Sequence, residues 1–275
     1  MNTGAFPLST EQEDSEHEEN ITLNGRQISG MQMLHIGCIL TGIPFLIMLF
    51  GGSWAIADFI PAHSPSATSA EISAFYRENY LSIRFGLALA FLGFSFILPI
   101  GSVIAAQTRR MEGMSPVLSN IQIASFSSGS LVFITTWICW LTAAFRPERS
   151  DSEIYLLNDL GWIFFVTTFI AYTVWDFAIG LAILLDQSDD PIYPRWVGYF
   201  NIFVGVSFIP DICTPFFQSG PFAWDGIFPF YIPYFMFFVW ILIMMWTTVQ
   251  AILKDENLAS NNKEFRHRNG KAKTC

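Results

Sequence analysis

Two aspartates, Asp176 and Asp211, lie inside stretches of the sequence that are otherwise apolar and aromatic. Asp176 belongs to TVWDFAIGLAILLD, and Asp211 belongs to VSFIPDICTP. A charged side chain near the centre of a bilayer costs at least about 2.5 to 3.5 kcal/mol, so such residues usually face a bundle interior or a wet cavity. A carboxyl group in that setting can take up and release a proton. The two aspartates are therefore the first candidates for a proton or substrate path.

Polar residues accompany both aspartates at the spacing of one helical face. Thr168 and Tyr172 precede Asp176 in steps of four residues, and Ser207 precedes Asp211 by four. With a rise of about 1.5 Å per residue, the two carboxyl groups are expected about 12 Å apart along the membrane normal. That separation is too large for a shared proton but suits two stations on one path. The alternative interpretation is that each aspartate is neutral or hydrogen-bonded to a neighbouring helix and only fixes the packing.

Prolines interrupt two of the apolar stretches. Pro210 and Pro215 flank the second aspartate and, because proline lacks an amide donor, they predict a kink in that helix. Pro99 predicts a similar break within GFSFILPIG. A single shift along the chain places Gly93–Ile97 on Gly205–Ile209, with four identities in five positions.

The match between these two segments suggests an inverted repeat of three helices. In such repeats, interrupted helices at matching positions mark a binding site near the midplane of the membrane. The first and fourth stretches need a different and longer shift. A chance match is the alternative, because the chain is rich in Phe, Ser and Gly.

The composition defines the elements that must position these residues. Of the 275 residues, 52% are hydrophobic and only 13% are charged, whereas soluble domains contain about 25% charged residues. Six apolar stretches are long enough to cross a bilayer as helices, which takes roughly 20 residues each. We expect them near Met33–Ile56, Ile83–Ala106, Ile121–Phe145, Leu160–Leu185, Trp196–Phe217 and Phe228–Leu253. The sequence therefore predicts an all-α fold, an integral membrane bundle of six transmembrane helices in a lipid bilayer.

The segments outside the membrane domain at residues 31–254 are short. Residues 1–30 are expected to form a disordered acidic tail, and residues 255–275 a loose basic tail. Ten of the fourteen Lys and Arg residues fall on the side of the N-terminus, which is typical of the cytoplasmic side, so both termini are predicted to be cytoplasmic. On the opposite surface, residues 59–82 predict a short interfacial helix.

Cysteine and histidine usage disfavours several kinds of chemistry. Cys38, Cys139 and Cys213 fall in separate predicted helices, and of the four histidines only His35 lies in one. A haem held by two histidines, a histidine-carboxylate metal centre and a disulfide framework therefore lack their residues, and we expect no metal and no cofactor. The sequence contains neither a familiar catalytic motif nor a basic pattern for nucleic acid. We therefore do not expect an enzyme, although unfamiliar membrane chemistry stays open.

Charged residues concentrate in two connections on the side opposite the termini. FRPERSDSEIYLLNDLGW carries Arg146, Arg149 and Asp159, and GPFAWDGIFPFYIP carries Asp225. These four residues are candidates for the outer mouth of a path. Aromatic residues near the helix ends fit the belts that anchor a protein at membrane interfaces. They are Trp54, Trp162, Trp224, Tyr231 and Trp196.

Four segments of the second half resemble a known group of proteins. FRPERS, LLNDLGW, PRWVGYFN and GPFAWDG are similar to segments of bacterial multi-pass membrane proteins of unassigned function. The resemblance covers about Phe145 to Pro233, roughly a third of the chain. It implies a protein of the bacterial cytoplasmic (inner) membrane and supports the predicted topology. It implies no activity, substrate or catalytic residue.

Two classes of function fit these observations. The first is transport or permeation of a small or lipophilic molecule, with proton coupling at Asp176 and Asp211. The second is a non-catalytic accessory or scaffold subunit of a membrane complex, which would dock a membrane protein partner or a second copy of the chain. A lipid-processing membrane enzyme comes third. Paired aspartates and proline-broken helices favour transport, whereas the small number of ionisable residues favours the accessory role.

The predicted topology can be tested by cysteine labelling in intact cells, in a variant that lacks the native cysteines. A membrane-impermeant thiol reagent should label a cysteine placed at Ser66 or Ser150, because both positions are predicted outside. It should not label a cysteine at Gly113 or Ser260, which are predicted inside. Labelling with the opposite pattern would contradict the orientation, and labelling at all four positions would contradict the six spans.

Overall fold

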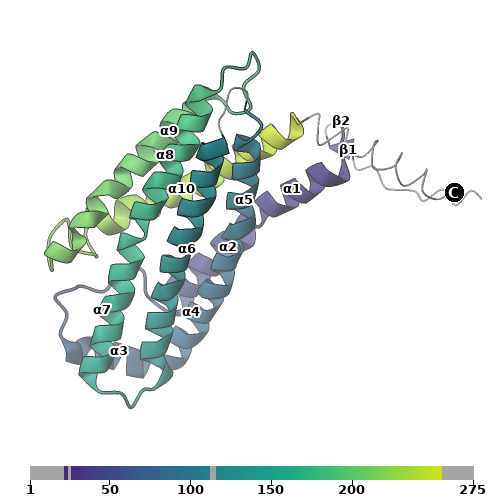
Figure 1. The fold of residues 1–275 in the computed structure, drawn as a ribbon. Helices are drawn as coiled ribbons and strands as arrows, with labels where there is room; N and C mark the ends of the chain where they lie inside the picture. Colours follow the sequence, from purple (N-terminus) through teal and green to yellow (C-terminus); the bar gives the residue numbers. More distant parts are fainter. Residues whose placement is uncertain (1–21, 24–25, 112–115, 256–275) are drawn as a thin grey trace, which may run out of the picture.

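The computed structural model describes residues 22–23, 26–111 and 116–255, so most of both predicted tails lies outside the described residues. Within these ranges, six helices are long and apolar enough to cross a bilayer, and they lie side by side in one bundle (Figure 1). These spans are Gly30–Ile56, Tyr80–Thr108, Pro116–Phe145, Asp151–Leu185, Arg195–Phe216 and Ile227–Leu253. The strands of the described residues are one short antiparallel pair, β1 (Thr22–Leu23) and β2 (Arg26–Gln27). The predicted all-α class and the six apolar helices are thus confirmed.

Most spans divide into shorter elements where the α-helix is interrupted. In chain order these are α1 (Gly30–Leu40), α2 (Gly42–Phe50), the π-helical η1 (Gly51–Ile56), α3 (Ser69–Glu78), α4 (Tyr80–Ser95), α5 (Ile97–Thr108), α6 (Pro116–Phe145), α7 (Asp151–Thr167), α8 (Phe169–Leu185), α9 (Arg195–Phe208), the 3₁₀ helix η2 (Ile209–Phe216), the π-helical η3 (Ile227–Tyr231) and α10 (Ile232–Leu253). The third span, α6, is an unbroken α-helix.

The starts of α1, α3 and α7 are set by capping boxes. The fourth span begins at Asp151, well before the predicted start, because Ser150 and Glu153 satisfy each other's backbone amides. The predicted helix between the first two spans is α3, which lies across one end of the bundle (Figure 1). Its apolar residues Ile72 and Tyr76 are buried, and α3 packs against α7. This helix therefore covers the bundle end instead of only resting on a membrane surface.

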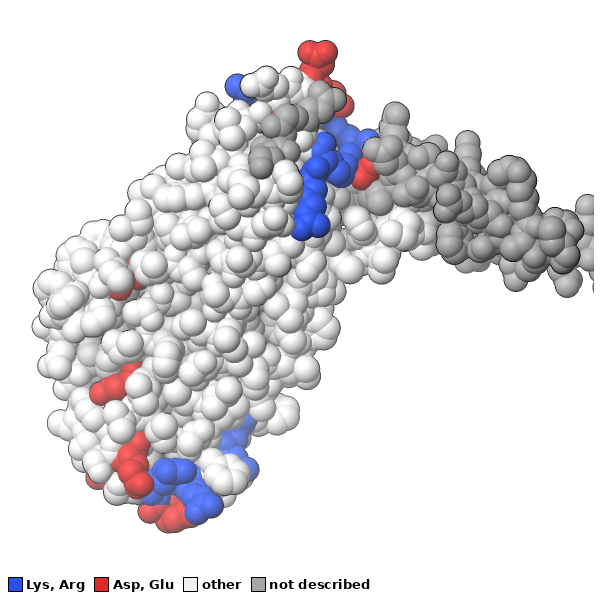
Figure 2. Space-filling view, in the orientation of Figure 1, with Lys and Arg blue, Asp and Glu red and all other residues white. Residues whose placement is uncertain are grey.

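Charged residues gather near the two ends of the bundle, and most of the surface between them is uncharged (Figure 2). The end that carries α3 is called the outer end below, after the predicted orientation. Trp54, Tyr231 and Trp196 are exposed, as expected for aromatic belts. The same prediction is wrong for Trp162 and Trp224, which are 1% and 8% exposed. Their rings stack on each other in the interior of the outer half, with centroids 6.5 Å apart.

The first and second spans break beside each other. Pro44 and Pro99 lack the amide hydrogens that would continue the helix ladder four residues back, so the chain is interrupted at Thr41 and Phe96. The hydroxyl oxygen of Thr41 lies 2.7 Å from the carbonyl oxygen of Phe96. One side chain therefore links the two interruptions.

The fourth and fifth spans are also interrupted. At Thr168 the hydroxyl donates to the carbonyl of Phe164 at 2.7 Å, a bond from side chain to backbone that bends helices. After Phe208 the α-helix gives way to η2, in which Pro210 and Pro215 cannot donate to the helix ladder. The kink predicted around the second aspartate is confirmed.

Glycines let neighbouring spans touch through their backbones at two places. A Cβ atom on Gly86 would lie 2.5 Å from the carbonyl oxygen of Gly52, and a Cβ on Gly52 would clash with the carbonyl of Gly86. In the second half, a Cβ on Gly180 would lie 2.9 Å from the carbonyl oxygen of Gly198, and the reverse distance is 3.1 Å. The first span is thus packed on the second, and the fourth on the fifth, at backbone distance.

Helix breaks and contact glycines recur at the two shifts found in the sequence, to within one residue. With the longer shift, the helix break and the contact glycine of the first span match the break and the contact glycine of the fourth span. With the shorter shift, the break and the contact glycine of the second span match those of the fifth span. The matching positions are Thr41 with Thr168, Gly52 with Gly180, Phe96 with Phe208, and Gly86 with Gly198. Three spans per half reverse the direction of the chain, so the halves correspond to an inverted repeat. The structure therefore supports the repeat over the chance match.

Substitution of the contact glycines tests this packing. We expect Gly86→Ala to lower the free energy of unfolding by about 1 to 3 kcal/mol, the range for overpacking, because the new methyl group meets backbone atoms. Gly198→Ala should act in the same direction. Gly37→Ala is the matched control, since a Cβ there meets nothing within 4 Å. Thermal or denaturant unfolding in detergent checks this, and equal midpoints for Gly86→Ala and Gly37→Ala would contradict the packing.

Candidate functional site

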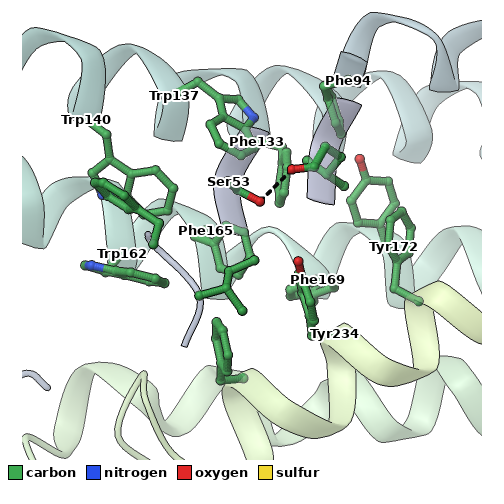
Figure 3. A pocket seen from close by; sticks show the side chains of 15 residues that line it. Ser53, Phe94, Phe133, Trp137, Trp140, Trp162, Phe165, Phe169, Tyr172 and Tyr234 are labelled. Atoms are coloured by element: carbon green, nitrogen blue, oxygen red, sulfur yellow. Dashed lines mark hydrogen bonds between the residues drawn. The ribbon is translucent and has the colours of Figure 1, made fainter. Parts of the chain in front are cut away.

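A small cavity lies between both halves of the bundle, toward the outer end (Figure 3). Its walls come from α2, η1, α4, α6, α7, α8, η3 and α10, with Phe59 and Ile60 closing it from the loop that follows η1. The volume is about 20 Å³, which holds about one water molecule. The lining includes the aromatic residues Phe59, Phe94, Phe133, Trp137, Trp140, Trp162, Phe165, Phe169, Tyr172, Phe230, Tyr234 and Phe237. The cavity is therefore an aromatic chamber that is nearly closed.

Several polar groups of the cavity wall lack hydrogen-bond partners. The indole nitrogens of Trp137 and Trp162 are buried and find no partner among the described residues, whereas the hydroxyl of Tyr234 faces that of Ser53 (Figure 3). Ser53 donates its hydroxyl to the carbonyl of Leu49 at 2.6 Å, so its oxygen can still accept. In Figure 3 the hydroxyls of Ser53 and Tyr234 point toward one another across the cavity. A largely apolar molecule with a carbonyl or hydroxyl oxygen could satisfy these donors.

Two loops cover the cavity at the outer end. The indole of Trp224 donates to the carbonyl of His63 at 2.7 Å, and the hydroxyl of Ser66 donates to the carbonyl of Gln218 at 2.9 Å. The imidazole of His63 packs on the ring of Phe75, with centroids 4.2 Å apart. Together the loops at residues 57–68 and 217–226 form what we call the outer cap.

The other end of the bundle is closed by a polar network. The guanidinium of Arg110 pairs with Asp255 at 2.9 Å and donates to the carbonyl of Ala251 at 3.2 Å. Gln32 donates to the carbonyl of Ile252 at 3.1 Å. Burial lowers the pKa of Arg110, and the charge of Asp255 opposes that shift. These bonds tie α1, the end of α5 and the end of α10 together, so the cavity is closed toward both sides.

Asp211 is fully buried in η2, and neither of its carboxyl oxygens has a hydrogen-bond partner among the described residues. Thr214 lies three residues later, one turn of a 3₁₀ helix, and therefore on the same side. Its hydroxyl is also buried and without a partner in the described part of the chain. An ionised carboxylate in this position would be uncompensated. The carboxyl group of Asp211 is therefore suited to taking up a proton, and its oxygens could also bind a cation.

The predicted polar face of α8 is buried, but its residues differ in what they contact. Tyr172 lines the cavity, and its hydroxyl lies 3.4 Å from that of Ser130. Thr168 bonds to its own helix, and Asp176 is buried beyond the cavity wall. On α9, Ser207 is half-buried and donates to the carbonyl of Val204 at 2.6 Å.

The two aspartates stand well apart along the helix axes. The hydroxyl of Thr173 donates to the carbonyl of Gly205 at 3.2 Å, which fixes the alignment of α8 with α9. Counting from that bond in both directions places Asp176 and Asp211 about 15 Å apart, given rises of about 1.5 Å in an α-helix and 2.0 Å in a 3₁₀ helix. Neither aspartate lines the cavity. The separation of about 12 Å expected from the sequence stays a prediction, and Tyr172 is the predicted path residue that lines the chamber.

The four outer-mouth candidates lie outside the cavity wall. Arg149 is 4.0 Å from Glu153, and Asp159 is half-buried and accepts from the amide of Asn158 at 3.5 Å. Asp225 is half-buried in the outer cap, next to Trp224. The fourth candidate, Arg146, lies over the ring of Phe145. What closes the mouth is an aromatic and backbone-bonded cap, not this set of charges.

Apart from Tyr172, the residues of the cavity wall were not predicted as site residues from the sequence. Phe133, Trp137 and Trp140 recur at the spacing of one face of α6, which is the signal that could have marked them. Large aromatics at helical spacing usually indicate core packing, so the spacing alone does not identify a chamber. No group of three or more His, Cys, Asp or Glu residues suited to a metal ion occurs in the described ranges.

Comparison with protein-family models, curated protein sequences and solved structures finds no match for this chain. The resemblance of the four segments in the second half therefore stays a prediction.

The outer cap should loosen at acidic pH. Burial lowers the pKa of His63 below its ordinary value of about 6.5, and Asp58 partly opposes this. The closed cap therefore has its full stability above pH 6.5 and loses stability as the pH falls below that value, since protonation favours the open form. Hydrogen exchange of residues 57–68 at pH 5.5 and 7.5, corrected for intrinsic rates, measures the change.

His63→Gln should remove this pH dependence, while His35→Gln, a control in α1, should keep it. Identical protection of the cap at both pH values in the unsubstituted protein would contradict the role of His63.

Proposed function

We propose that the protein transports a small lipophilic molecule across the bacterial cytoplasmic membrane, coupled to proton movement at Asp211 and Asp176. The observation that carries the proposal is the recurrence of helix breaks and glycine contacts at matching positions of two inverted halves. In transporters built this way, interrupted helices border the binding site, and the halves move against each other. The orientation with both termini in the cytoplasm is part of the proposal and is supported by the Lys and Arg distribution.

The chemistry of the cavity favours an apolar substrate with one or two acceptor oxygens. Aromatic rings offer large apolar surfaces, and the indole donors of Trp137 and Trp162 have no protein acceptor among the described residues. None of the cavity-lining residues that the structure describes is charged. A substrate with a fixed charge would therefore enter without compensation.

The burial of Asp211 favours proton coupling, because the same site tolerates the two protonation states of the carboxyl group very differently. A neutral carboxyl tolerates burial without partners far better than a carboxylate does. The element that carries Asp211, η2, packs against α7, α8, α9 and η3, of which α7, α8 and η3 contribute to the cavity wall. A change in the protonation of Asp211 would therefore alter the stability of the closed arrangement.

The accessory role remains the second candidate, and one observation favours it. The cavity holds about one water molecule, and the helix pairs beside it are packed at backbone distance. A scaffold needs no opening, whereas a transporter must open at each end in turn.

Locking the outer cap separates the two candidates. Ser66→Cys with Gln218→Cys, joined by a short bifunctional thiol reagent, should abolish function in a transporter and leave a scaffold active. The measurement is rescue of the growth defect of a strain that lacks this chain, at matched protein level. Each single-cysteine variant, treated with the same reagent, is the control and should rescue.

Asp211→Asn should likewise fail to rescue while folding normally, because it keeps the shape and removes the titratable group. Asp225→Asn, at a half-buried carboxyl group in the outer cap, is its control. Full rescue by both the locked protein and Asp211→Asn would reject transport and favour the accessory role.

A further inference from the structure

Two arginines meet at one phenylalanine ring at the outer end of the bundle. Phe145 ends α6 and is 56% exposed. The guanidinium carbon of Arg84, from α4, lies 5.5 Å from the ring centroid, and that of Arg146 lies 5.8 Å from it. The salt bridges of the described residues involve neither arginine. Two like charges held near one ring repel each other, so an anion bound there would be stabilised by both.

Two other arginines at the outer end, Arg77 and Arg149, have carboxylate partners. Arg77 pairs with Asp151 at 2.6 Å and also donates to the carbonyls of Pro147 and Arg149. Arg149 lies 4.0 Å from Glu153. Asp151 and Glu153 are thus engaged with Arg77 and Arg149, whereas no salt bridge among the described residues involves the pair at Phe145.

An apolar groove continues from the arginine pair along α6. Its walls are Ile138, Leu141, Thr142 and Phe145, which follow one side of the last two turns of the helix, and its volume is about 250 Å³. The hydroxyl of Thr142 donates to the carbonyl of Ile138 at 2.6 Å, so it offers no donor to the groove. The groove is open along the helix.

We propose that the arginine pair and the groove together bind one anionic phospholipid. The phosphate accepts hydrogen bonds from Arg84 and Arg146, since guanidinium groups bind phosphate through paired, charge-assisted bonds. One acyl chain lies against Ile138, Leu141 and Phe145, where it fills the groove. The site combines an unpaired positive charge at the predicted interface with apolar surface at membrane depth, and this combination fits a lipid better than a free anion.

The inference is independent of transport, because it concerns the outer surface of α4 and α6 and not the cavity. It predicts that phosphatidylglycerol raises the unfolding temperature of the delipidated protein more than phosphatidylcholine does, both supplied in mixed micelles. Arg84→Gln with Arg146→Gln should remove the difference. In native mass spectrometry the same double variant should retain phosphatidylglycerol roughly tenfold or more weakly, as expected for lost charge-assisted hydrogen bonds.

Arg195→Gln is the matched control, because it removes the same charge from an exposed position at the opposite end. It should retain the lipid like the unsubstituted protein, and if it loses the lipid equally, the effect is general electrostatics and the site is rejected. Equal stabilisation by the two lipids in the unsubstituted protein would also overturn the proposal. Equal stabilisation by soluble glycerol phosphate would show an anion site without a lipid and would overturn it as well. Leu141→Ser, which leaves both arginines in place, should weaken retention of the lipid through the groove alone.

Discussion

A carbonyl group released from a helix inside a bilayer has no water to bond, and leaving it unsatisfied costs several kcal/mol. This constraint governs the arrangement of the present bundle, because five of its six spans divide into shorter helical elements. Side-chain hydroxyls meet part of the need: Thr41 reaches the carbonyl of Phe96 on the next span, and Thr168 bonds within its own helix. Interrupted helices therefore lie beside one another, and the cavity lies among them.

The packing within the helix pairs differs from the packing around the cavity. Glycine contacts hold the first span on the second and the fourth on the fifth at backbone distance, where a single methyl group has no space. The interface at the cavity is made instead of large aromatic rings, joined by few hydrogen bonds, and it is closed at the ends by loops and a polar network. In the transport cycle that we propose, the two pairs of closely packed helices would move as units about the aromatic interface.

The sequence was sufficient for the class, the number of spans and the kink at Asp211, because these depend on local composition and on proline. It also contained both repeat shifts, although short matches alone could not exclude chance. The sequence did not predict the early start of the fourth span, because the apolar stretch used to place that span begins only after polar residues such as Asp151 and Asp159. The helix starts earlier, at Asp151, where a capping box begins it. Trp162 and Trp224 were assigned to belts because position along a helix does not reveal which side faces the interior. The cavity itself depends on contacts between residues as distant as Ser53 and Tyr234, which no local pattern specifies.

The central claim is that the two halves exchange between outward-open and inward-open arrangements around the cavity. Distances between spin labels test it most directly, with one pair at Ser66 and Gln218 on the outer cap and another at Arg109 and Lys254 on the opposite end. In proteoliposomes studied by double electron–electron resonance, each pair should show two distances. Acidification from pH 7.5 to 5.5 should shift the two pairs in opposite directions, so that one end widens as the other narrows. A single, pH-independent distance at both pairs would contradict the exchange and would leave a static scaffold.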